Sequence, residues 1–329
     1  MESHQPTGRH PLWLFFGVEL EVIIVLPEEI RDQIENYQTK IGDGTRSPAM
    51  LWTAWRATRI GGRVPRICSV LSHLGLVKSE SCGTHVHVSP SPKYGWDDSY
   101  LVELQRICRT AVYFERCIDA LVPPRRRRSH WCKSHRHNLH FRGHSMQEIF
   151  DKIDQVETSS DLAKLMCPSP DGHDSTSRDY KWNFSSMERK EGQTKRRAHT
   201  IEFRQPPGIE EENDALFWTC FKIAFIEGAH LYGRSKSEGG LLDANKTGQL
   251  EDLLQLVLLG YKCTDQLSED IKLVFQNFFR DKEHLPEDQE DEEELTPTNV
   301  REIQDADGNT HMTDDKFLAL FSSKSKDRA

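Results

Sequence analysis

The chain has 329 residues, of which 36% are hydrophobic and 29% are charged, and its formal net charge is −9 at pH 7. This length allows one large domain, or two ordinary ones, with a buried core. The negative charge argues against nucleic acid as the main partner, and no stretch reaches the roughly 20 apolar residues that a membrane helix needs. The eight cysteines include no CxxC pair, which is typical of reduced thiols, so we expect a cytoplasmic protein.

The spacing of apolar residues predicts strands and helices in irregular alternation along the chain. A buried strand is predicted over 12–26, where β-branched and aromatic residues lie between two prolines. The segments 50–60 and 63–77 have helical periodicity and are predicted as short helices. A long helix is predicted over 97–123. The other predicted elements are helices over 27–41, 145–166, 211–233, 250–261 and 268–281, and strands over 84–89, 180–187 and 197–208.

The order of these elements predicts the fold class. No regular βαβ repeat is present, which favours an α+β fold with a largely antiparallel sheet and helices packed on one face. We expect a main domain over 12–235, a helical extension over 236–281 and an acidic tail over 282–329. The tail contains the run "EDQEDEEEL", and we expect it to be disordered apart from a short terminal helix.

Three predicted strands share one pattern of alternation. Successive side chains of a strand point to opposite faces of the sheet. In "GVELEV" this places Glu19 and Glu21 on one face, and in "THVHVS" it places His85 and His87 on one face. In "TIEFRQ" Glu202 shares its face with Arg204 and not with its apolar neighbours. Each strand therefore has one apolar face for a core and one face of ionisable groups.

These ionisable faces suit a site for a divalent cation and a phosphate. Carboxylates and neutral imidazoles bind divalent metals, and the planar guanidinium of an arginine binds phosphate oxygens in pairs. A single ExE strand is more often a solvated face, and a single HxH pair is more often structural. Three such strands need three separate coincidences, so we favour one shared site of the kind that phosphoryl transfer requires.

The motifs "FGVELEV", "SCGTHVHVSP" and "TIEFRQPPG", in this order, resemble the amidoligases, a family found often in fungi. That family belongs to the carboxylate–amine ligase superfamily with glutamine synthetase and glutamate–cysteine ligase. Two less specific stretches agree with the resemblance, namely "YFERCIDALVPPRRRRSHWCKS" and "YKWNFSSM". The resemblance covers roughly residues 12–235 and implies a glutamine-synthetase-like sheet.

The resemblance implies an ATP-dependent ligase that joins a carboxylate to an amine through an acyl phosphate. The substrates would be small-molecule or peptide acids and amines, and the cofactors ATP and Mg²⁺, or Mn²⁺ in its place. The roles carried over are one metal ion held by Glu19, His85 and Glu202, a second held by Glu21, and the phosphoryl group steadied by Arg204. Further contacts to substrate or nucleotide are implied for His87, Asn183, Arg126, Arg127 and Arg128.

One feature of the family is not found in this sequence. The family carries a strand of the form Glu-Leu-Val-Ser-Pro between its ExE and HxH motifs, and this strand supplies a further carboxylate. Here the interval holds "DGTRSPAM", and from the sequence we expect no such strand in it. Glu80, five residues before His85, is a candidate substitute for the carboxylate, although a glutamate in a loop is usually only solvated. Two alternatives to the ligase therefore stay open: a degenerate domain that binds nucleotide or a protein partner without turnover, and a metal-dependent hydrolase.

The connector "HWCKSHRHNLH" has one cysteine and four histidines. These are zinc ligands, but their spacing matches no zinc finger, and a basic loop that faces solvent or nucleotide is the favoured interpretation. The preceding run "RRRR" is interpreted as a contact for a substrate or nucleotide anion, and not as a nucleic-acid patch.

Overall fold

The computed structural model describes residues 14–20, 23–24, 51–55, 76–77, 83–90, 95–127, 129–171, 174–189, 199–208, 212–234, 239–263, 270–280 and 282. Several predicted features lie outside these residues. They are the helix over 27–41, most of the helix over 63–77, nearly all of the acidic tail, Glu21, Glu80 and Arg128.

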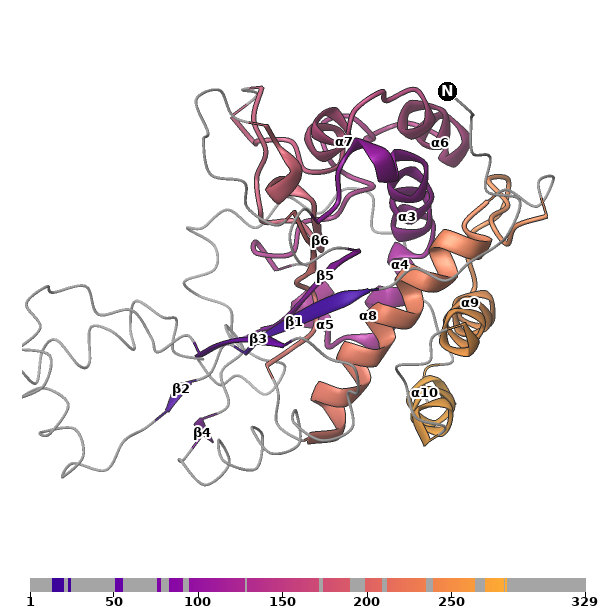
Figure 1. Ribbon diagram of the computed structural model, residues 1–329. Helices are drawn as coiled ribbons and strands as arrows, with labels where there is room; N and C mark the ends of the chain where they lie inside the picture. The colour runs from indigo at the N-terminus through magenta and orange to yellow at the C-terminus, as the bar shows by residue number, and fades with distance from the viewer. Residues whose placement is uncertain are drawn as a thin grey trace, which may run out of the picture.

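The centre of the fold is a five-stranded antiparallel sheet with the strand order β3-β1-β5-β7-β6 (Figure 1). Its strands are β1 (Phe15–Leu20), β3 (Leu51–Trp55), β5 (Thr84–Ser89), β6 (Trp182–Asn183) and β7 (Ile201–Phe203). A separate two-stranded sheet joins β2 (Ile23–Ile24) to β4 (Leu76–Val77). The prediction of an α+β fold with an antiparallel sheet is therefore confirmed, and strands far apart in sequence lie next to each other.

The segment 51–55 is a strand, so the prediction of a helix over 50–60 is wrong for these residues. Leu51–Trp55 pairs with β1 in antiparallel register, with Leu20 opposite Leu51. The sequence "LWTAW" combines aromatic and β-branched residues, which favour a pleated surface, and pairing with β1 outweighs the helical spacing of its apolar residues. The interval before the HxH motif thus contains a strand after all, but that strand has no carboxylate.

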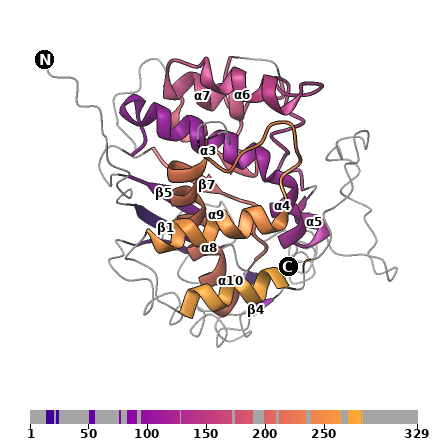
Figure 2. The same ribbon diagram turned by 90° about the vertical axis from the view of Figure 1, so that its right-hand side faces the viewer.

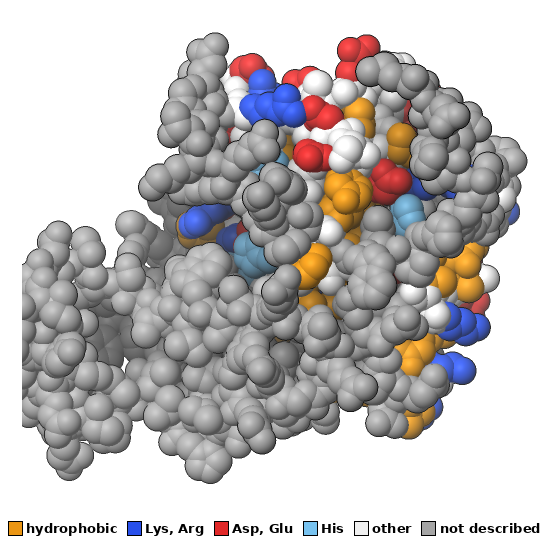
Figure 3. Space-filling model, viewed as in Figure 1, with side chains coloured by type: hydrophobic (Ala, Val, Ile, Leu, Met, Phe, Trp, Pro, Cys, Tyr) orange, Lys and Arg blue, Asp and Glu red, His pale blue; other side chains and the backbone are white. Residues whose placement is uncertain are grey.

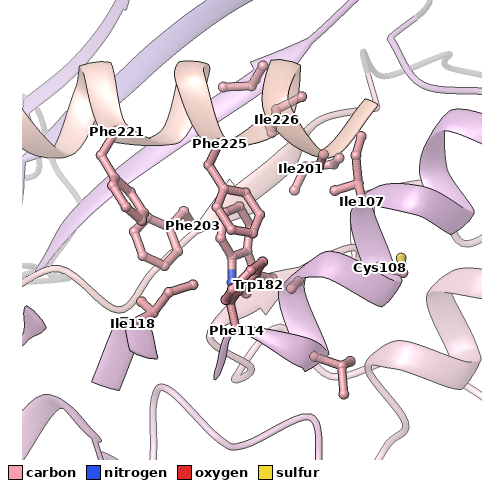
Figure 4. Close-up of a cluster of buried hydrophobic side chains, with 14 of the residues drawn as sticks. Ile107, Cys108, Phe114, Ile118, Trp182, Ile201, Phe203, Phe221, Phe225 and Ile226 are labelled. Atoms are coloured by element: carbon pink, nitrogen blue, oxygen red, sulfur yellow. The ribbon is translucent and has the colours of Figure 1, made fainter. Parts of the chain in front are cut away.

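One face of the sheet forms the hydrophobic core. Val18 pairs with Val86, and Val86 pairs with Phe203, so these side chains share a face. On the same face Trp182 stacks on Phe203 with 4.4 Å between ring centroids, and on Phe225 of the covering helix with 4.8 Å (Figure 4). The alternation predicted from the sequence therefore supplies the apolar face that packs against the helices.

Helices cover this apolar face in layers. Helix α8 contacts β5 directly, α3 lies beside α8, and α9 and α10 pack on the outer side of α8 (Figure 2). Helices α6 and α7 pack against α3, above the sheet in the view of Figure 1. The helices are α3 (Leu101–Tyr113), α4 (Glu115–Leu121), α5 (Pro124–Arg127), α6 (Met146–Asp154), α7 (Ser159–Met166), α8 (Glu212–Tyr232), α9 (Leu250–Lys262) and α10 (Asp270–Arg280), with 3₁₀ turns at η2 (Asp98–Tyr100) and η3 (Ser185–Met187).

Local signals explain where several helices begin. The side chain of Asp97 accepts a hydrogen bond from the Ser99 backbone N–H at 3.0 Å and caps η2. Ser145 and Glu148 form a capping box at the start of α6. Phe114 separates α3 from α4, so the helix predicted over 97–123 is divided into two.

None of the described helices is long and apolar enough to cross a membrane.

Glycines allow α8 and α9 to approach closely. A Cβ atom added at Gly260 would lie 1.9 Å from the Ala224 carbonyl oxygen and 2.5 Å from the Gly228 nitrogen. We expect Gly260→Ala to lower the free energy of unfolding by about 1–3 kcal/mol, because backbone atoms must move apart. Urea denaturation measures this loss, with Gln255→Ala on the exposed side of α9 as the control. Wild-type stability in Gly260→Ala would contradict the close approach.

Candidate active site

The strand register brings several of the predicted site positions to one face of the sheet, opposite the core. Glu19 pairs with His85, and His87 pairs with Glu202. Glu202 also pairs with Asn183 on the neighbouring strand. Directly paired residues of adjacent strands share a face, so four strands contribute to one patch. Figure 3 shows histidine side chains close to Lys and Arg side chains on one face of the molecule.

Glu202 is at the centre of this patch and is buried. Its Oε1 atom lies 2.6 Å from Nη1 of Arg204, 3.2 Å from Nδ1 of His85 and 3.8 Å from Nε2 of His87. Its Oε2 atom accepts a hydrogen bond from the Asn183 amide at 2.6 Å. We refer to these five residues as the Glu202 cluster. Predicted residues from three separate motifs therefore meet at one carboxylate.

The cluster keeps the Glu202 carboxylate ionised. Burial alone would raise the pKa of Glu202, but the hydrogen bond from His85 and the charges of Arg204 and His87 lower it far below its usual range. The carboxylate therefore carries a full negative charge at any physiological pH. A charged carboxylate beside two imidazoles and a guanidinium can bind a cation or position a phosphate.

A residue after β6 and a residue before β7 orient the side chains of the cluster. The Asn183 Oδ1 atom accepts a hydrogen bond from the Ser185 backbone N–H at 2.8 Å, which directs the amide NH₂ toward Glu202. His87 Nδ1 lies 3.1 Å from the Thr200 hydroxyl, which leaves Nε2 on the side of Glu202. Both contacts come from residues adjacent to the strands, and they set the orientation of the polar side chains.

Arg126 and Arg127 contact backbone carbonyl oxygens near the site, and they are not part of the Glu202 cluster. The buried Arg126 donates hydrogen bonds to the carbonyl oxygens of Arg204 and Gln205 at 2.6 and 3.1 Å. Arg127 donates to the Val122 carbonyl at 3.2 Å. Arg126 thus fixes the chain that follows β7, and a nucleotide contact by the arginine run stays a prediction.

A buried charged network beside the site was not predicted from the sequence. Lys181 Nζ lies 3.1 Å from Glu115 Oε1 and 2.7 Å from Asp119 Oδ1. Glu115 also accepts a hydrogen bond from the His135 backbone N–H at 2.8 Å, and Asp119 accepts one from the Gln205 amide. The spacing of the two carboxylates, i and i+4 on a helix, was the available signal. The network joins α4 to β6 and to the residue that follows Arg204.

His135, a buried histidine of the histidine-rich connector, has a structural role. His135 Nε2 accepts a hydrogen bond from the Trp182 backbone N–H at 3.1 Å, and Nδ1 lies 2.9 Å from the Met166 carbonyl oxygen. Both ring nitrogens are therefore engaged by the backbone, and burial lowers the pKa of His135. Among the residues that the structure describes, no three His, Cys, Asp or Glu side chains are arranged to hold a metal ion.

Two groups of the Glu202 cluster have a spacing that could suit a divalent metal ion. Two ligand atoms at right angles, each about 2.1 Å from an ion, lie about 3 Å apart, and His85 Nδ1 and Glu202 Oε1 are 3.2 Å apart. These two groups fit adjacent coordination positions. A third protein ligand would come from position 19, which is in register with His85, and whose backbone alone is described here.

Acid should destabilise this protein, because two of its buried carboxyl groups have lowered pKa values. The charge of Lys181 outweighs the effect of burial and lowers the pKa of Glu115 to about 2, and the pKa of Glu202 is also lowered. Groups with a depressed pKa stabilise the fold above their ordinary value of about 4.5 and lose that contribution as pH falls toward 2. The pKa of Asp119 is raised, mainly by burial, so Asp119 is protonated first and adds no such loss.

We expect the thermal unfolding midpoint to fall steeply between about pH 4.5 and pH 2. Calorimetry as a function of pH measures this, with the double variant Glu115→Gln, Glu202→Gln as the comparison. The double variant should start from a lower midpoint and show a shallower decline. An equally steep decline in the double variant would contradict the assignment to these two carboxylates.

Comparison with known proteins identifies a family for this chain. Residues 63–226 match a family model described as "Putative amidoligase enzyme". The matched segment includes the whole Glu202 cluster and begins after Glu19 and Glu21. No curated protein and no solved structure was found to match the chain.

Proposed function

The chain belongs to the amidoligase family through residues 63–226, and we propose that it is an ATP- and Mg²⁺-dependent ligase that joins a carboxylate to an amine. Family membership supports amide-bond formation as the reaction class. The Glu202 cluster is the observation that carries the proposal, because it gathers metal-ligand and phosphate-binding side chains on one face of a sheet. We further propose that this sheet is of the glutamine-synthetase type and that the protein acts in the cytoplasm.

The reaction has two steps. An oxygen of the substrate carboxylate attacks the γ-phosphorus of ATP, ADP leaves, and an acyl phosphate forms. The amine then attacks the acyl carbon, phosphate leaves with the bonding electrons, and the amine nitrogen loses a proton to the surrounding solvent. The acids and amines are small molecules or peptide groups.

The residues of the cluster have distinct roles in this proposal. His85, Glu202 and Glu19 would hold one Mg²⁺ and Glu21 a second, and this metal charge would neutralise the phosphates and orient the nucleotide. Arg204 has five N–H donors in a plane, so it can bind Glu202 and a phosphoryl oxygen together.

Three other groups serve as supporting contacts in the proposal. Asn183 holds Glu202 in its orientation through the 2.6 Å hydrogen bond. His87, on the same face, contacts substrate or phosphate. Arg127 and Arg128 contact the nucleotide.

A second candidate function is nucleotide binding without turnover. The observation in its favour is β3, which occupies the edge next to β1 but places Trp52 opposite Glu19. A carboxylate from that strand would complete the second metal site, and the described strand has none.

Phosphate release with mixed acids and amines tests the proposal. Phosphate formed from ATP only when both substrates are present supports the ligase. ATP that is bound but not consumed supports the second candidate, and turnover without ATP indicates a metal-dependent hydrolase. Either of these results would overturn the proposed ligation. Omission of the acid or of the amine, one at a time, is the control in each assay.

A further inference from the structure

A buried lysine lies on the core side of the sheet, directly behind the Glu202 cluster. Lys222 belongs to α8, a helix of 21 residues in which most of the described buried side chains are apolar. Its side chain is fully buried. The charged residues of the candidate site point the other way, so Lys222 does not belong to that site.

The contacts of Lys222 are with backbone and an aromatic ring. Its Nζ atom donates hydrogen bonds to the carbonyl oxygens of Val86 and Ile201, each at 2.5 Å. It also lies 5.5 Å from the centre of the Trp182 ring. None of the described carboxylates forms an ion pair with it. The ammonium is therefore held by two strand carbonyls and the face of an indole.

This arrangement is costly for stability. Burial lowers the pKa of Lys222 well below its usual range, against the attraction of the Glu202 charge across the sheet. An ammonium without an ion-pair partner in a core costs free energy that an apolar side chain of similar length would not. Both carbonyls belong to strands flanked on both sides, and a carbonyl oxygen can accept a ladder bond and a lysine bond together. Packing alone does not account for a lysine here.

The two carbonyls are adjacent to the residues of the cluster. Val86 lies between His85 and His87 on β5, and Ile201 immediately precedes Glu202 on β7. Lys222 Nζ therefore connects the peptide group that joins Val86 to His87 with the peptide group that joins Ile201 to Glu202. Any change in the spacing of β5 and β7 would change the 3.2 Å separation of His85 Nδ1 and Glu202 Oε1.

We propose that Lys222 is a positioning residue, which fixes β5 against β7 from the core side and so sets the separation of His85 and Glu202. The inference deepens the proposed function, because this separation is the one that a shared metal ligand set requires. Partners that orient metal ligands change metal affinity by about 10–100-fold when they are removed. The same range is expected for Lys222.

Lys222→Met tests the proposal, since methionine is unbranched, apolar and flexible enough to fill the same space. We expect this variant to keep or raise the thermal unfolding midpoint, because it removes an amino group whose charged form is costly to bury. We expect faster amide hydrogen exchange in peptides that cover 84–89 and 200–205. We also expect the Mn²⁺ dissociation constant, measured by electron paramagnetic resonance on the full chain, to rise about tenfold or more.

Leu256→Ala on α9 is the matched control, because Leu256 is fully buried against the far side of α8. It should lower the unfolding midpoint and leave Mn²⁺ binding unchanged. Exchange over β5 and β7 that is as slow in Lys222→Met as in the wild type would overturn the positioning role. Loss of the fold in Lys222→Met would overturn it as well, since the lysine would then be required for stability.

The two proposals can fail separately. Wild-type protein that binds no Mn²⁺ would count against the metal site of the proposed function, while the exchange comparison would still decide the role of Lys222. Mn²⁺ binding that is equally tight in the wild type and in Lys222→Met would leave the metal site supported and would overturn the positioning role.

Discussion

Replacement of Glu202 by glutamine is expected to reduce ATP-dependent coupling at least a hundredfold. The carboxylate is the common partner of Arg204, His85 and Asn183, and in the proposed reaction it binds the metal that neutralises the phosphates. Loss of one preorganised charged group in a water-excluded site commonly costs a factor of about 10²–10³ in turnover. Phosphate release in the presence of both substrates measures the loss.

Glutamine is a sharper test than alanine at this position. Alanine would leave the buried Arg204 guanidinium without its 2.6 Å contact, and the penalty for an uncompensated buried charge would be confused with a catalytic effect. Glutamine keeps one oxygen that can accept from Arg204. The control is Glu157→Gln, an exposed carboxylate at the turn before α7, which should retain full turnover. Comparable turnover in Glu202→Gln and in the control would exclude Glu202 from the reaction.

The second large effect is expected at Lys181, whose replacement by methionine should lower the free energy of unfolding by about 3–5 kcal/mol. The lysine is buried and contacts both Glu115 and Asp119. Without it, two carboxylates about one helical turn apart would remain in the interior with no cation between them. Chemical denaturation at pH 7 measures the loss.

Two further variants isolate the cause of this effect. In Lys164→Met a surface contact with the exposed Asp174 is lost instead, and the unfolding midpoint should stay unchanged, because exposed ion pairs contribute little. Adding Asp119→Asn to Lys181→Met should restore part of the lost stability, since it removes one uncompensated charge. A double variant that is less stable than Lys181→Met would contradict the account of the network.

Alternation of residue types made much of the candidate site predictable. His85 and His87 alternate with Val86, and Glu202 alternates with Ile201 and Phe203, so a strand assignment by itself separates a polar face from a core face. The order of the predicted elements indicated the antiparallel sheet, and the spacing of apolar residues predicted the long helix α8. These signals are local and strong, because each strand must bury one face.

Other features depend on contacts between distant segments, and no local pattern reveals them. The segment "LWTAW" has helical spacing, and only its pairing with β1 makes it a strand. Lys222 interrupts an apolar helix and looks like a solvent-exposed position, yet the sheet supplies two carbonyl oxygens to it. Lys181 likewise meets its carboxylates only because β6 lies beside α4.

Paramagnetic broadening of histidine ring signals by Mn²⁺–ATP would test the shared cation and phosphate site most directly. We expect substoichiometric Mn²⁺–ATP to broaden the NMR signals of His85 and His87 before those of His140 and His144, which lie in the connector and the turn before α6. We also expect Glu202→Gln to abolish this selectivity. Equal broadening of all four histidines in the wild type, or none at all, would contradict a single cation and phosphate site at the Glu202 cluster.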